Sequence, residues 1–247
     1  MTREIDNVTI VCCWNNQQQF KLLLKDIEKQ NINISVLGID NTKQRFKSCS
    51  SAYNYALKKV QSEFVIFMHQ DILLPEHDII QKFINYVKQV EDNSIIGVTG
   101  STFDSEYVST NVVIGENKDY GGSLRVNGIS NCDTLDECMF GGRTKFFVNN
   151  QFDEVLCNGW HLYTVELCLR TKIRGGHVYV CDLSLIHNSN GVTDSAYNKC
   201  FNKLCYKYKN NYKFIRTPCC YATRTSFIYR NLYYLKNFIR IMLRRNL

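Results

Sequence analysis

Residues 64–71 read FVIFMHQD, and this stretch indicates how the chain folds. Five consecutive apolar residues, Phe64–Met68, form a run of strand length, and His69, Gln70 and Asp71 follow it directly. A strand that is apolar throughout is buried on both faces, which is typical of a parallel sheet covered by helices. The three polar residues would then lie at the carboxyl end of the strand, where such sheets bind ligands.

The same pattern recurs on both sides of this stretch. Apolar runs of strand length occur at 8–14, 34–39 and 95–99, and helical patterns separate them at 17–30, 50–60 and 78–90. This alternation predicts an α/β, Rossmann-like fold with a mostly parallel sheet and helices on both faces. Since the carboxyl ends of parallel strands meet at one edge, we expect three polar groups to lie together. They are Trp14-Asn15-Asn16, Asp40-Asn41 and His69-Gln70-Asp71.

The second half of the chain is less regular. Residues 100–148 are rich in Gly, Ser and Asn, and the pairs Gly121-Gly122 and Gly141-Gly142 suggest loops or strand turns. A helical pattern covers 161–171, and an apolar run over 178–186 predicts one further strand that ends at His187. His187 follows this run and precedes a Ser/Asn/Gly turn, which suits a metal ligand.

Composition indicates an ordinary globular protein. The 247 residues are 45% hydrophobic and contain two prolines, so one α/β domain with an appended segment is expected. The twelve cysteines include no CxxC spacing, and several lie in apolar runs, which favours reduced core residues in a cytoplasmic protein. The sequence shows neither a signal-peptide core nor an apolar run long enough to span a bilayer.

Charge is distributed unevenly along the chain. The net charge is +7, yet no acidic residue follows Asp194, whereas twelve Lys and Arg do. Residues 221–247 combine this charge with apolar residues at helical spacing, which favours a helix lying on an anionic membrane surface. A terminal helix packed on its own domain is the alternative. No recognised nucleic-acid-binding module accompanies the charge, so nucleic acid is not an expected partner.

Four motifs together resemble a known family. They are FVIFMHQDILLP (64–75), CDTLDECMF (132–140), FDEVLCNGWHLYTVELCLRTKIRGG (152–176) and LIHNSNGV (185–192). In order and spacing they resemble the family-2-related glycosyltransferases of the streptomycin-biosynthesis type, over residues 7–192. The resemblance implies the GT-A fold, a nucleotide-sugar donor, most often a UDP-sugar, and a divalent metal, Mn²⁺ or Mg²⁺. It also implies a glycan or lipid-linked acceptor in cell-surface polysaccharide synthesis.

The resemblance divides the chain and locates the enzyme. Residues 1–195 would form the GT-A domain, with a nucleotide-sugar-binding half (1–100) and an acceptor half (101–195). Residues 196–247 would form the basic helical C-terminal segment. A lipid-linked acceptor and a basic tail together predict a cytoplasmic protein bound peripherally at the inner face of the cell membrane.

The resemblance also assigns residues to the donor and the metal. Asp71 matches the last acid of a DxD-like motif and His187 a late histidine, and both would bind the metal. His69 stands where many relatives have the first Asp, which meets the donor ribose. Asp40 would bind the nucleobase or ribose, and Asn54 would face the donor.

The general base is the point at which the match weakens. Thr164 stands where relatives carry an acid, so the resemblance leaves Glu166, which keeps the later acid of the same motif, or Asp136, which lines the donor or acceptor cleft. Loss of the acid also allows a GT-A-like protein that binds a sugar nucleotide without turnover. A nucleotidyltransferase is disfavoured, because 11–19 (VCCWNNQQQ) lacks the Gly, Lys and Arg of a phosphate loop.

Overall fold

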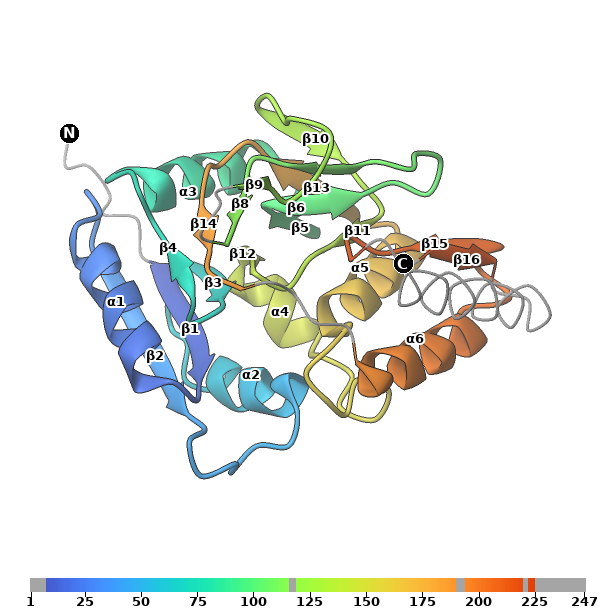
Figure 1. The fold of residues 1–247 in the computed structure, drawn as a ribbon, viewed down its shortest axis with the longest axis horizontal. Helices are drawn as coiled ribbons and strands as arrows, with labels where there is room; N and C mark the ends of the chain where they lie inside the picture. The colour runs from blue at the N-terminus through green and yellow to red at the C-terminus, as the bar shows by residue number, and fades with distance from the viewer. Residues whose placement is uncertain (1–7, 116–118, 190–193, 220–221, 225–247) are drawn as a thin grey trace, which may run out of the picture.

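The computed structural model describes residues 8–115, 119–189, 194–219 and 222–224 (Figure 1). The predicted membrane-surface helix over 221–247 therefore lies, except for 222–224, outside the described residues. Within the described part of the chain, no helix combines the length and apolarity needed to cross a bilayer.

A seven-stranded sheet forms the centre of the molecule, in the order β10-β13-β5-β12-β3-β1-β2. The strands β1, β3, β2, β5 and β13 are parallel, and β12 and β10 run antiparallel to their neighbours. Their bounds are β1 (Val8–Trp14), β2 (Ile34–Asp40), β3 (Phe64–Met68), β5 (Ser94–Gly97), β10 (Ile129–Asn131), β12 (Met139–Arg143) and β13 (His177–Cys181).

Helices cover both faces of this sheet (Figure 1). Phe64, Ile66 and Met68 of β3 pack with α1 and α3, whereas Val65 and Phe67 pack with α2, α4 and α5 on the opposite face. The helices are α1 (Gln17–Glu28), α2 (Cys49–Leu57), α3 (Ile79–Gln89), α4 (Thr144–Asn149) and α5 (Tyr163–Ile173). The mostly parallel α/β sheet with helices on both faces, predicted from the apolar strands, is confirmed.

One glycine pair was misread from the sequence. Gly141 and Gly142 lie inside β12, between β3 and β5, and not in a loop. A Cβ atom at Gly141 would approach the carbonyl oxygen of Val65 to 2.3 Å, so this strand fits beside β3 only with glycine there.

The apolar run over 178–186 is also not one strand. β13 ends at Cys181, and a separate strand, β14 (Ile186–His187), joins a small sheet in the order β4-β14-β8-β9. The other members are β4 (Ile72–Leu73), β8 (Val113–Ile114) and β9 (Asp119–Tyr120). Antiparallel pairing places His187 opposite Ile72, so this small sheet brings His187 beside the residues that follow β3.

The remaining elements extend the acceptor side of the fold. A second small sheet has the order β11-β6-β7, formed by β11 (Thr134–Leu135), β6 (Thr99–Ser101) and β7 (Val108–Thr110). The helix α6 (Ser195–Lys207) lies near α5, and a hairpin of β15 (Phe214–Arg216) and β16 (Ala222–Arg224) follows it (Figure 1). Phe201 and Ile215 are buried in the same core as α2 and α5. The predicted division at residue 195 stays a prediction, although α6 packs into the core of the body.

The cysteines contribute to packing. All cysteines in the described residues are free, and all of them except Cys13 and Cys219 are buried.

Candidate functional site

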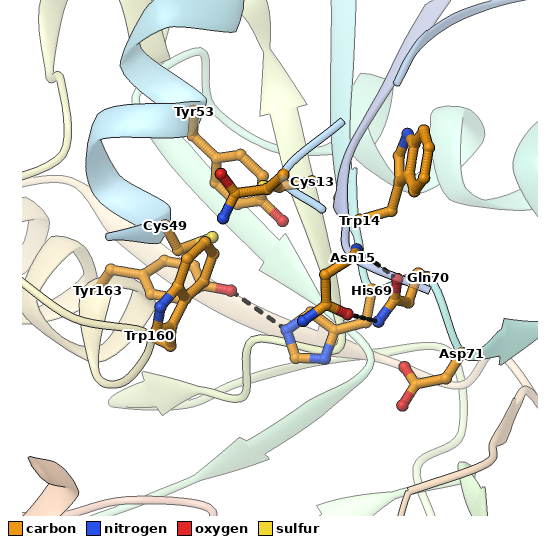
Figure 2. A pocket seen from close by; sticks show the side chains of 11 residues that line it. Cys13, Trp14, Asn15, Cys49, Tyr53, His69, Gln70, Asp71, Trp160 and Tyr163 are labelled. Carbon is orange, nitrogen blue, oxygen red and sulfur yellow. Dashed lines mark hydrogen bonds between the residues drawn. The ribbon is translucent and has the colours of Figure 1, made fainter. Parts of the chain in front are cut away.

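A pocket opens at the carboxyl ends of β1, β2 and β3, where the sequence predicted a ligand site (Figure 2). Parallel strands that end at one edge leave their following loops side by side, and these loops form the floor of the pocket. The helix α2 and the segment before α5 form its walls. The lining residues are Cys13, Trp14, Asn15, Asn41, Cys49, Tyr53, His69, Gln70, Asp71, Trp160 and Tyr163.

Aromatic side chains border the pocket on two sides. Figure 2 shows Trp160 and Tyr163 on one side and Trp14 on the other, with Asn15 and His69 between them. The volume is about 280 Å³, just below the range of roughly 300–1,000 Å³ for small-molecule pockets. Such a site combines flat apolar surfaces with a few polar groups that fix the orientation of a ligand.

Three side chains at one end of the site can hold a metal ion. One ligand atom from each of His69, Asp71 and His187 lies within 4.8 Å of the others. His187 Nε2 is 3.4 Å from Asp71 Oδ1, and the Asn188 amide donates to the Asp71 carbonyl at 3.0 Å, which secures β14 beside this loop. The His187 Nε2 atom is buried and faces the Asp71 carboxylate. Carboxylates suit Mn²⁺ and Mg²⁺, and imidazoles suit divalent transition-metal ions, so the donor set fits a divalent metal.

The electrostatics of this cluster also suit a cation. Burial and the neighbouring His187 lower the pKa of His69, which favours the neutral imidazole that a metal requires. Burial raises the pKa of Asp71, but hydrogen bonding to His187 and the histidine charges outweigh it, so the net pKa is lowered. Burial lowers the pKa of His187, but Asp71 outweighs it, so its net pKa is raised. Asp71 is therefore ionised and available to a cation.

Asp136 lies near this cluster but does not line the pocket. Its Oδ1 accepts from the Cys138 amide at 2.9 Å, and its charge acts to raise the pKa of both His69 and His187. The Cys219 thiol lies 3.8 Å from its Oδ2. Asp136 therefore presents a partly exposed carboxylate on the side of the site that faces the C-terminal hairpin.

Glu166 is in a different environment. Its side chain is fully buried, and its Oε1 accepts from Lys207 Nζ at 2.8 Å and from the Tyr208 hydroxyl at 2.7 Å. Arg170 adds further hydrogen bonds from the next helical turn. The structure does not bring Glu166 to the pocket, and its hydrogen bonds stabilise the packing of α5 against α6. Thr164, where an acid was expected, is also fully buried.

Two predicted donor-binding residues lie away from the pocket lining. Asp40 ends β2 and is exposed, and its carboxylate accepts from the amide and hydroxyl of Thr42 at 2.8 and 2.7 Å. Asn54 is buried, and its amide bonds to both backbone groups of Phe152 and to Glu154. Asp40 is therefore the direct neighbour of the lining residue Asn41. Asn54 instead hydrogen-bonds α2 to the segment before α5.

Sequence reasoning assigned no role to several lining residues. Tyr163 hydroxyl lies 3.2 Å from His69 Nε2 and fixes that ring, and Trp160 contributes a ring that is 44% exposed. For Trp160, the sequence offered one signal of a lining residue: Asn158-Gly159 predicts a turn, and Trp160 follows it directly before a helix. For Tyr163 there was none, because a tyrosine in the first turn of a buried helix reads as a core residue.

The profile of a family described as glycosyltransferase like family matches residues 9–214. No curated protein matches the chain significantly.

Solved structures with a similar fold share little sequence with this chain. TarS from S. aureus, residues 1–349 in complex with UDP-GlcNAc, has a TM-score of 0.57 at 12% identity, covering 82% of this chain and 66% of that chain. The same TarS fragment with UDP has a TM-score of 0.56 at 13% identity, covering 83% and 66%. GalNAc-T7 with UDP, GalNAc and Mn²⁺ has a TM-score of 0.53 at 10% identity, covering 83% and 48%. This chain thus spans from about half to just under two thirds of those chains, and at these identities the likeness shows the fold alone.

Proposed function

The chain belongs to the glycosyltransferase like family, and from that premise we propose that it transfers a sugar from a nucleoside diphosphate sugar to an acceptor hydroxyl. The fold is of the GT-A type. The observation that carries the proposal is the cluster of His69, Asp71 and His187 at the end of an aromatic-walled pocket. This pocket lies at the strand ends where α/β sheets bind nucleotides.

The donor we propose is a UDP-sugar. The TarS structures contain UDP or UDP-GlcNAc, and the GalNAc-T7 structure contains UDP and Mn²⁺. In this chain the flat ring of Trp14 and the amide of Asn15 offer a stacking surface and hydrogen bonds to a nucleoside. Asp40, exposed beside Asn41, is within the same rim of strand ends and is proposed to contact the ribose or base.

The diphosphate would lie toward Asp71. His69, Asp71 and His187 would hold a divalent ion, Mn²⁺ or Mg²⁺, which when bound neutralises charge on the departing diphosphate. Tyr163 holds the His69 ring in place by its 3.2 Å contact with Nε2, and the paired strands β4 and β14 hold His187. The chain itself thus preorganises the end of the pocket at which the leaving group must be stabilised.

Asp136 is the residue we propose as the general base. The acceptor oxygen forms a bond to the anomeric carbon, the bond from that carbon to the phosphate oxygen breaks, and the hydroxyl proton passes to the Asp136 carboxylate. Glu166, the other candidate, is enclosed by Lys207, Arg170 and Tyr208 and cannot reach a substrate without breaking those contacts. The partial exposure of Asp136 beside the metal cluster favours it instead.

The acceptor and location are proposed from the sequence. A glycan or lipid-linked acceptor in cell-surface polysaccharide synthesis suits an enzyme that also carries the basic segment within 196–247. We propose that this segment holds the cytoplasmic enzyme peripherally at the inner face of the membrane. Cosedimentation with phosphatidylglycerol vesicles tests the membrane contact. We expect the full chain to bind the vesicles more strongly than a chain that ends at residue 224, and equal binding would contradict the proposal.

Donor hydrolysis tests the main proposal. Purified protein is incubated with a panel of nucleotide sugars, with and without Mn²⁺, and the released nucleotide is measured. We expect slow release from one donor that depends on metal and is lost in Asp71→Ala, whereas the exposed-surface control Asp104→Ala retains it. Donor binding without release, even with membrane lipid extract added, would instead support the alternative of a sugar-nucleotide-binding protein without turnover.

A further inference from the structure

The segment before α5 has an unusual backbone. Leu162 has φ of 64°, in the left-handed region that a branched apolar residue rarely adopts. The residue is also buried, so the strain is not relieved by solvent or by motion at a surface. Strained residues of this kind persist only where their surroundings hold them, and they concentrate at functional sites.

Contacts from three parts of the fold hold this segment. From α2, the Cys49 amide donates to the Gly159 carbonyl at 3.0 Å. From α6, the Cys200 thiol lies 3.7 Å from the His161 carbonyl oxygen. From the strand-end segment before β12, the buried Glu137 carboxyl accepts from the Leu162 amide. The segment 159–162 is therefore preorganised, and its consecutive residues Trp160 and His161 are presented in fixed positions.

His161 forms a pair with an acid. Its Nε2 is 3.4 Å from Asp194 Oδ1, and its side chain is 29% exposed. Asp194 is itself fixed, because it caps α6 and accepts from the Tyr197 amide at 2.9 Å. A histidine whose Nε2–H points at a carboxylate has its Nδ1 free to accept a hydrogen bond. Within the described ranges, Nδ1 of His161 has no protein partner.

A chain of contacts connects the pair to the residues around Asp136. The His161 ring packs edge-on against Tyr197, with centroids 5.5 Å apart, and the Tyr197 hydroxyl is 2.7 Å from Thr217 Oγ1 in the turn that carries Cys219. Cys219 in turn lies beside Asp136, the proposed base. The charge of His161 also acts on His69, which places it near the metal cluster. His161 therefore stands between the residues of the donor and the residues around the base.

We propose that Trp160 and the His161–Asp194 pair form the acceptor subsite, and that its ligand is a sugar ring. The proposal rests on the glycosyltransferase function proposed above and names the class of its acceptor. Trp160 offers a flat apolar ring to the C–H face of a sugar, and the oriented His161 accepts a hydrogen bond from a hydroxyl next to the one that reacts. An apolar surface beside one oriented polar group is the pattern by which polyhydroxylated rings are bound. His161 thus acts as a positioning residue.

The two tryptophans of the chain make this testable without knowing the natural acceptor. Trp14 borders the donor end and Trp160 the proposed acceptor subsite, so tryptophan emission reports both. Protein saturated with UDP and Mn²⁺ is titrated with methyl glycosides of glucose, galactose, mannose and N-acetylglucosamine. We expect at least one glycoside to change the emission, and we expect the change to vanish in Trp160→Phe.

Substitution of the pair then tests its role. His161→Asn should raise the apparent Kd of that glycoside roughly 10- to 100-fold, the range for loss of an oriented hydrogen bond. Asp194→Asn keeps a side chain that caps helices well, so the fold is retained while the carboxylate that orients the His161 ring is lost, and it should raise Kd by a smaller factor. The control is His177→Asn, because His177 forms a comparable surface pair with Glu91 at 3.9 Å.

The outcomes separate this inference from the proposed function. UDP binding with no response to any glycoside, or unchanged affinity in His161→Asn, would overturn the acceptor subsite and leave the transferase standing. Failure of UDP and of every donor to bind or react would overturn both. Loss of glycoside affinity in His177→Asn as well would show a general structural effect and would also contradict the assignment.

Discussion

Gln70 and Asn15 are joined by hydrogen bonds in both directions. Gln70 Oε1 accepts from the backbone amides of Asn15 and Asn16, each at 2.9 Å, and Gln70 Nε2 donates to Asn15 Oδ1 at 2.8 Å (Figure 2). One side chain thereby fastens the loop after β3 to the loop after β1. Asp71 lies in the loop after β3, and Trp14 ends β1 directly before the other loop, so the pair sets the distance between the proposed diphosphate and nucleoside ends of the pocket.

Replacing Gln70 with Leu should weaken donor binding. The two exposed backbone amides lose their protein acceptor, at a cost of about 0.5–1.5 kcal/mol for each hydrogen bond, and the loop that follows Trp14 is released. We expect UDP affinity, measured by calorimetry with Mn²⁺ present, to fall by about tenfold or more. Gln81→Leu is the matched control, because Gln81 bonds to Asn85 on the surface of α3. Equal UDP affinity in both variants would show that the pair does not shape the pocket.

His69 should act as a metal ligand together with Asp71 and His187. We expect His69→Gln to reduce Mn²⁺ affinity by at least about tenfold, since even partners of metal ligands contribute 10- to 100-fold. Electron paramagnetic resonance of free Mn²⁺ measures the affinity without any turnover. His77→Gln is the control, because His77 is exposed and its ring bonds to the backbone carbonyl of Lys29, far from the metal cluster in the sequence. Wild-type affinity in His69→Gln would return this histidine to the donor-ribose role expected from the sequence.

The sheet was predictable because its signals are local. The run Phe64–Met68 and its counterparts are apolar at every position, and burial on both faces of a parallel sheet requires that pattern. The polar residues that end these strands meet at one edge for the same reason, so Asn15, Asn41 and Asp71 were located from sequence. Gly141 was misread because its requirement comes from the neighbouring strand β3, which lies far away in sequence.

The chemistry of single residues was less predictable because it depends on distant partners. A carboxylate such as Glu166 has the same local sequence signature whether it faces a substrate or Lys207, and only α6 decides between the two. His161 received no role from the sequence for the same reason, since its partner Asp194 is thirty-three residues away. His187 was placed correctly at the end of an apolar run, but the pairing of β14 with β4 brings it to Asp71.

Glu166→Gln should destabilise the protein and leave the catalytic chemistry intact. Arg170 would lose its carboxylate partner, and Lys207, which is 37% exposed, would keep only Asp153, so we expect a cost of about 1–3 kcal/mol, below that of a fully buried ion pair. Thermal unfolding should show the loss, while the rate of donor hydrolysis per folded molecule at low temperature stays within about twofold of wild type. Abolished hydrolysis in a variant that remains folded would instead identify Glu166 as the general base.

Glu137 should make stability fall as pH rises. Its carboxyl is buried, and burial together with the negative charge of Asp136 raises its pKa well above the ordinary value of 4.5. The hydrogen bond from the Leu162 amide lowers the pKa, but by less than burial and Asp136 raise it. The folded protein therefore keeps this proton at pH values where the unfolded chain has lost it. Because the folded state binds more protons, the free energy of unfolding decreases as the pH rises above about 4.5. The decrease is at most about 1.4 kcal/mol per pH unit, and it ends when the carboxyl ionises in the folded protein.

Glu137→Gln removes this dependence, because the amide is neutral in both states and its oxygen can still accept from Leu162. We therefore expect the Tm of the variant minus that of wild type to increase steadily between pH 5 and pH 8. Glu106→Gln, at an exposed position, should show a constant difference over the same range. A constant difference for Glu137→Gln as well would mean that the carboxyl ionises normally in the fold. Glu137 would then hold the segment of Trp160 and His161 as a carboxylate at every pH from 5 to 8. In that case the glycoside affinity should not weaken as the pH rises over this range.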